Sequence, residues 1–132
     1  MTIVFAKVDI SQLERALDSL KEAFSVGVCG ELERDGTIQR FEYTFELAWK
    51  TMRRCLIAMG NAQVSASPRP VLRMAFREGF ISDIELWFEF LEARNAASHI
   101  YDEGRADLVF EVSKKLPVEV EGLIAELKNS GE

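Results

Sequence analysis

The spacing of apolar residues along the chain is helical almost throughout. These residues recur three and four positions apart, which places their side chains on one face of a helix. The expected helices begin at Asp9 or Ser11, Thr37, Pro70, Ser82, Asp107 and Val118, and end near Phe24, Gly60, Arg77, Asp102, Leu116 and Leu127. The pattern predicts an all-α fold: an up-and-down four-helix bundle with an additional short helix.

Glycine and proline set the expected breaks between these helices. Segment 26–36 is glycine-rich and is expected to be a loop or a frayed helical extension, and segment 61–70 a connection. Gly104 is the expected stop of the helix that begins at Ser82, and Pro117 either kinks one helix or opens a new one. Alternation typical of a strand is weak and confined to residues 2–8, so we expect one bundle domain over 1–132.

The helix expected from Ser82 to about Asp102 changes character along its apolar face. Ser82 and Glu85 have the spacing of a capping box at its start. At about 100° per residue, Trp87 and Leu91 lie on the buried stripe. The same stripe then carries Arg94, Asn95, Ser98, His99, Tyr101 and Asp102. Because buried polar groups need partners, this cluster predicts a cleft or a subunit interface.

Two interpretations of this polar cluster stay open from the residues alone. It can be a buried network that joins helices, or it can perform acid–base chemistry on a phosphodiester. An imidazole can accept or donate a proton near neutral pH, and His99 is the only histidine; Arg94 can hold a phosphate through two hydrogen bonds. Asn95 lies four residues before His99 and can orient its ring. One histidine cannot act as base and acid in one step, so we expect a two-fold dimer to supply the second.

Other patterns lie outside this cluster. The aromatic stretch from Gln39 to Lys50 is most simply core packing, while Glu42, Glu46 and Lys50, four apart, form a solvated or pairing face. The expected short helix carries a row of basic residues, which either form surface ion pairs or contact a phosphate or an acidic partner. The members of this row are Arg69, Arg73 and Arg77.

Charge and composition limit the class of protein. The net charge of −6 argues against general attraction to nucleic acid, so any RNA contact is local or uses a patch built by two subunits. Cys29 and Cys55 are isolated, which is typical of packing thiols in a reduced, cytoplasmic protein. No spacing predicts a metal site or a nucleotide-binding glycine loop, so no cofactor is expected. Neither a signal peptide nor a membrane span is expected.

Three segments together resemble one family: RFEYTFELAWK from Arg40, AFREGFISD from Ala75 and RNAASHIYDE from Arg94. They resemble the nucleotidyltransferase substrate-binding family of the HEPN superfamily. The resemblance implies a homodimeric helical bundle with the motif helices meeting in a cleft, and a small nucleotidyltransferase of the MNT type as partner. In many HEPN proteins the matching Arg and His form a metal-independent ribonuclease site, which implies catalytic roles for Arg94 and His99, with Asn95 as an accessory.

The resemblance also implies a form of regulation. In HepT-type toxins the transferase antitoxin adenylylates a tyrosine two residues after the histidine, which corresponds to Tyr101. The leading hypothesis is therefore a toxin endoribonuclease neutralised by its partner. The alternative, implied by the family's name, is a non-catalytic subunit that presents a substrate or nucleotide to the transferase. A third hypothesis, a purely structural adaptor, retains the partner without the nucleotide.

Overall fold

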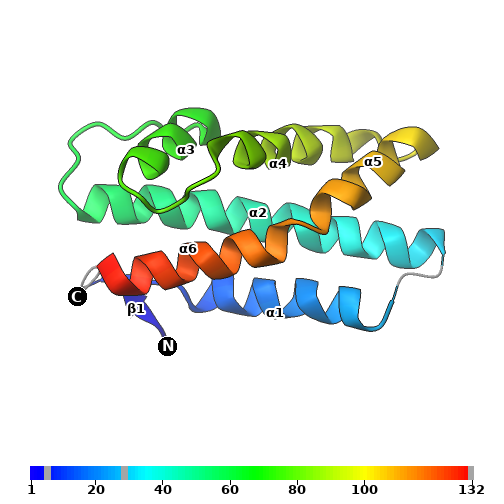
Figure 1. Ribbon diagram of the computed structural model, residues 1–132, viewed down its shortest axis with the longest axis horizontal. Coiled ribbons are helices and arrows are strands. Elements are labelled where there is room, and N and C mark those ends of the chain that lie inside the picture. Colours follow the sequence, from blue (N-terminus) through cyan, green and yellow to red (C-terminus); the bar gives the residue numbers. More distant parts are fainter. Residues whose placement is uncertain (5–6, 28–29, 131–132) are drawn as a thin grey trace.

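The computed structural model describes residues 1–4, 7–27 and 30–130, and it confirms the all-α fold (Figure 1). A short antiparallel ladder pairs Ile3 with Asp9 and Val4 with Val8. Its strands are β1 (Ile3–Val4) and β2 (Val8–Asp9). The helices are α1 (Ser11–Ser25), α2 (Glu31–Ala58), α3 (Pro68–Arg77), α4 (Ile84–Ala96), α5 (Glu103–Ser113) and α6 (Leu116–Ser130), with a 3₁₀ turn, η1 (Ala97–His99), after α4.

The chain passes along the bundle four times. Helices α1 and α2 form the first two passes, α4 forms the third, and α5 with α6 returns as a bent fourth pass (Figure 1). Helix α2 is the longest, and it contacts every other α-helix of the bundle. The short helix α3 precedes α4 at the end of the bundle where α2 ends.

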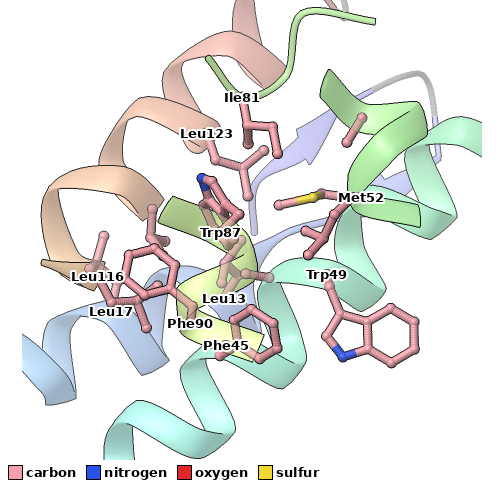
Figure 2. Packing of buried hydrophobic residues seen from close by; sticks show 14 of the residues in the cluster. Leu13, Leu17, Phe45, Trp49, Met52, Ile81, Trp87, Phe90, Leu116 and Leu123 are labelled. Atoms are coloured by element: carbon pink, nitrogen blue, oxygen red, sulfur yellow. The ribbon is translucent and has the colours of Figure 1, made fainter. Parts of the chain in front are cut away.

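Aromatic residues of α2 and α4 form the centre of the core. Phe90 meets Phe41 and Trp87 edge to face, with ring centroids 6.3 and 5.2 Å apart. The Phe45 and Trp87 centroids are 6.2 Å apart (Figure 2). All four side chains are fully buried, so the core interpretation of the aromatic stretch is confirmed for Phe41 and Phe45. This packing fixes α4, and hence the start of the polar motif, against α2.

Helix α2 begins at Glu31, so the expected start at Thr37 is wrong. The added turns are held by Arg34, a buried residue whose guanidinium contacts both oxygens of Glu103 at 2.9 and 3.3 Å. The same guanidinium donates to Asp107 at 3.2 Å. These bonds compensate for the helix-weakening glycine at position 36, because they attach this end of α2 to α5.

Helix α4 is shorter at both ends than the sequence predicts. The capping box at Ser82 is wrong: Asp83 is the cap, and its Oδ1 accepts the Leu86 N–H at 3.1 Å. The expected continuation to Asp102 is also wrong, because the helix ends at Ala96 and Asp102 caps α5 by accepting the Gly104 N–H at 3.0 Å.

The remaining boundaries differ less from the expectation. Gly104, the expected stop of the preceding helix, lies in the first turn of α5. Helix α5 begins at Glu103, earlier than the expected start at Asp107. Pro117 opens a new helix, one of its two expected roles, because α6 begins at Leu116 and proline fits the first turn. Helix α3 begins at Pro68 and ends before Gly79, where a φ of +82° favours glycine.

Candidate functional site

The four motif residues lie where α4 passes into α5, at the opposite end of the bundle from the loop joining α2 and α3 (Figure 1). Arg94 and Asn95 belong to the last turn of α4. His99 ends η1, and Tyr101 lies in the turn before α5. The chain changes direction here, so these residues do not share the single helical face that the sequence predicts.

The motif is mostly exposed in the single chain, which contradicts the prediction that it prolongs the buried stripe. Asn95 and His99 are exposed, and Tyr101 is 83% exposed. The buried side chains at this point are those of Ala93 and Ala97. The helical repeat that placed the later polar residues on the stripe stops at Ala96, so they turn outward.

Arg94 is half-buried against α2, and its guanidinium forms an ion pair with Glu46. Its Nη1 also donates to Asn95 Oδ1 at 3.3 Å. The second carboxylate oxygen of Glu46 lies 3.5 Å from Lys50 Nζ. Arg94 is therefore oriented by a carboxylate that an incoming phosphate would have to displace.

A hollow of about 380 Å³ adjoins Arg94 and is lined by residues of α2. Glu42 and Glu46 contribute carboxylates to it, and Gln39 and Tyr43 complete its wall. Burial raises the pKa of Glu42, and the positive charge of Arg94 partly opposes this effect. The surroundings of Arg94 are thus acidic, and protonation of Glu42 would make them less so.

His99 and Tyr101 contact each other directly. The His99 Nδ1 and the Tyr101 hydroxyl oxygen are 3.3 Å apart, and the rings meet edge to face with centroids 5.9 Å apart. In the described ranges, no hydrogen bond or ion pair joins Arg94 to either residue. The predicted proximity of Arg94 and Tyr101 on one helical face is therefore replaced by a pairing of Tyr101 with His99.

The basic row lies on α3, at the far end of the bundle from the motif turn (Figure 1). The guanidinium carbons of Arg69 and Arg73 lie 4.7 and 5.6 Å from the centroid of the Phe88 ring. Arg77 is exposed in the last turn of α3. The first two arginines therefore cover an aromatic ring of α4, which is a packing role that neither expected interpretation included.

Metal-binding clusters and membrane-spanning helices are two further kinds of feature that bear on function. Within 1–4, 7–27 and 30–130, no three His, Cys, Asp or Glu side chains are grouped so that they could hold a metal ion. No helix in the described part of the chain has the length and apolar character needed to cross a membrane. Cys55 is buried in the core, and Cys29 lies outside the described residues.

Residues 8–129 match the profile of the family described as nucleotidyltransferase substrate binding protein like. The chain belongs to this family. It is 33% identical over 96 residues to the probable ribonuclease HepT of Haemophilus influenzae, an alignment that covers 70% of this chain and 66% of that protein.

Two solved structures of similar proteins share the fold of this family member. A crystal structure from Thermus thermophilus has a TM-score of 0.79 and 34% identity, over 88% of this chain and 98% of that one. A Haemophilus influenzae structure, described as revealing the fold of a substrate binding domain of a nucleotidyltransferase, has a TM-score of 0.78 and 28% identity. That match covers 90% of this chain and 98% of the other.

Sequence reasoning did not assign Glu46 to the site. The spacing of Glu42, Glu46 and Lys50 indicated a pairing face, and the structure shows that Glu46 pairs with Lys50. The additional pairing with Arg94 joins residues on different helices. A charge pattern along one helix carries no signal for such a contact.

Proposed function

We propose that this chain is a metal-independent endoribonuclease of the HEPN type that acts as a homodimer. Its activity is neutralised by a small nucleotidyltransferase of the MNT type, which adenylylates Tyr101. The observation that carries the proposal is the contact of His99 Nδ1 with the Tyr101 hydroxyl, 3.3 Å apart in an exposed turn. A group attached to that hydroxyl would lie against the only histidine of the chain.

The reaction follows from the chemistry of these side chains. A ribose 2′-oxygen attacks the adjacent phosphorus while the bond from phosphorus to the 5′-oxygen breaks, leaving a 2′,3′-cyclic phosphate. His99 accepts the proton of the 2′-hydroxyl, and His99 of the partner subunit donates a proton to the leaving 5′-oxygen. Arg94 stabilises the added negative charge on the phosphorane, and Asn95 holds the guanidinium through its amide oxygen.

The exposed surface beside the motif suits contact with a second copy. Ala93 and Ala96 of α4 line a groove of about 250 Å³ with Leu108 and Val109 of α5, and two glutamates of α4 and one arginine of α5 also contribute to its wall. Leu108 is 67% exposed in the single chain. Covering this groove would bury apolar area next to the motif turn, which supports the homodimer on energetic grounds.

Adenylylation would inhibit the site through charge and bulk. The Tyr101 hydroxyl loses its proton to solvent as its oxygen attacks the α-phosphorus of ATP, the bond from the α-phosphorus to the bridging oxygen of the β-phosphate breaks, and pyrophosphate leaves. The resulting phosphodiester is negatively charged and lies where the tyrosine hydroxyl met the imidazole. It would repel an RNA phosphate and occupy the space beside His99.

The two tyrosines of the chain give a matched test. The chain is co-expressed with the nucleotidyltransferase from the neighbouring open reading frame, and the intact mass of the chain is measured. Wild type and Tyr43→Phe should gain one adenylate, whereas Tyr101→Phe should gain none. In parallel, unmodified protein should cleave RNA in EDTA, and His99→Ala should lower the rate about 10²–10⁴-fold. Modification of Tyr101→Phe, or unchanged cleavage by His99→Ala, would refute the assignment.

The ion pair of Arg94 with Glu46 favours a second candidate. A guanidinium already neutralised by a carboxylate is less available for RNA, and the chain is acidic overall. A non-catalytic subunit that presents a substrate or nucleotide to the transferase would need no such availability. This candidate predicts no RNA cleavage by the purified homodimer, but faster nucleotide transfer by the partner when this chain is added.

A further inference from the structure

A second hollow lies along α2, beyond the acidic surroundings of Arg94. It has a volume of about 460 Å³, and α1 and the loop before α3 contribute to its wall. All its charged lining residues are basic: Lys50, Arg53 and Arg54. On a chain with a net charge of −6, such a local excess of positive charge is an exception. We call this hollow the basic groove.

The two arginines are oriented by neutral acceptors, so their charges remain uncompensated. Arg53 Nε donates to the backbone oxygen of Ser65 at 2.9 Å. Arg54 Nη2 contacts the Asp9 backbone oxygen at 3.4 Å and Thr51 Oγ1 at 3.3 Å. In the described part of the chain no ion pair engages either arginine. Lys50 differs, because it lies 3.5 Å from Glu46.

An apolar wall accompanies these charges. Trp49 lines the basic groove with 6% of its surface exposed, and its ring lies apart from those of Phe45 and Trp87 (Figure 2). Lys50 Nζ lies 5.9 Å from the centroid of the indole. The indole Nε1 of Trp49 is buried and has no acceptor among the residues described, as is also true of the Trp87 Nε1 in the core. The indole therefore gives the groove an aromatic surface beside its cations.

We propose that the basic groove binds a small ligand carrying a chain of phosphate groups. Guanidinium groups match phosphate oxygens geometrically, and uncompensated charge makes such bonds strong. The volume lies in the range of small-molecule sites, and Trp49 with Leu47 offers an apolar surface beside the cations. Neither Arg94 nor His99 lines the basic groove. The proposed binding of phosphate groups therefore goes beyond the proposed ribonuclease activity and does not depend on it.

The two tryptophans of the chain make the site directly observable. In the ¹⁵N-labelled protein they give two indole N–H signals, and Trp49→Phe shows which signal belongs to which tryptophan. Titration with ATP in EDTA should shift the Trp49 signal saturably and leave that of Trp87, buried in the core, unmoved. A parallel titration with tripolyphosphate tests whether the phosphate chain binds without a nucleoside. Binding by both indicates recognition of the phosphate chain, and binding by ATP alone indicates that the nucleoside is also required.

Paired variants separate a specific site from diffuse attraction. Lys50→Gln combined with Arg54→Gln should weaken binding about tenfold or more, because charge-assisted bonds are lost. Lys114→Gln combined with Lys115→Gln removes the same charge at the junction of α5 and α6 and should leave affinity unchanged. No saturable shift of the Trp49 signal, or equal weakening by both double variants, would overturn the proposal. Neither of these outcomes changes the result expected from RNA cleavage by His99→Ala, so failure of this proposal can be distinguished from failure of the proposed ribonuclease.

Discussion

Replacing Glu46 by glutamine should increase the affinity of the chain for RNA. Glu46 forms an ion pair with Arg94, the residue proposed to hold the scissile phosphate. A phosphate must compete with this carboxylate before it can reach the guanidinium. Glu46→Gln keeps the shape and length of the side chain and removes its charge, so it weakens the competitor without opening a cavity.

The magnitude follows from the exposure of the pair. The Arg94 and Glu46 side chains are 35% and 23% exposed, so solvent screens their attraction only in part. Exposed pairs contribute about 0.2–1 kcal/mol, and this pair lies toward the upper end of that range. If Glu46→Gln removes about 1 kcal/mol of attraction that competes with the RNA phosphate, the affinity for RNA should increase about fivefold. The increase should shrink at high salt, because electrostatic binding to RNA weakens there.

Fluorescence anisotropy with a labelled RNA oligonucleotide measures this effect. Both proteins carry His99→Ala so that the RNA is not cleaved during the titration. Glu111→Gln is the matched control, because it removes one carboxylate of α5 that pairs with Lys114 instead of Arg94. An equal gain in RNA affinity by Glu111→Gln would show that the gain comes from the change in net charge alone. No gain in Glu46→Gln would refute the idea that this ion pair limits access to Arg94.

Three further predictions concern stability and reactivity. The bond from Arg34 lowers the pKa of Glu103 below 4.5, so Glu103→Gln should be less stable than wild type at pH 7, and the difference should vanish as pH falls through that lowered pKa. Phe90→Ala should lower the free energy of unfolding by about 3–5 kcal/mol in urea titrations, because the ring is fully buried. Burial raises the pKa of Cys55 to about 11, so peptide mapping should find it unlabelled by a thiol reagent at pH 8 until urea unfolds the chain.

The fold could be predicted largely from local patterns. The three- and four-residue repeat of Leu13, Leu17 and Leu20 identified α1, and all three side chains are buried. The boundaries that failed depend on contacts remote in sequence. Arg34 and Glu103 are 69 positions apart, and their bond holds the part of α2 that was expected to be a loop or a frayed helical extension. A local pattern contains no information about such a pairing.

The candidate site was predictable in composition but not in geometry. The motif identified Arg94, Asn95, His99 and Tyr101 as neighbours in sequence, and the structure places them around one turn. Their relative placement was wrong because it assumed that the helix continues to Asp102. One break after Ala96 separates Arg94 from Tyr101 and pairs Tyr101 with His99 instead.

Exposure of the motif changes the argument for a homodimer. A buried polar cluster would need cover to satisfy its hydrogen bonds, but His99 and Tyr101 are already solvated in the single chain. Besides the apolar area that a second copy would cover between α4 and α5, the argument is chemical, because cleavage needs a base and an acid while each chain has one histidine. RNA cleavage per chain should therefore rise with protein concentration over the range in which sedimentation shows monomers forming dimers. A constant rate per chain in a strictly monomeric sample would show that a single His99 suffices and that the dimer is not part of the active site.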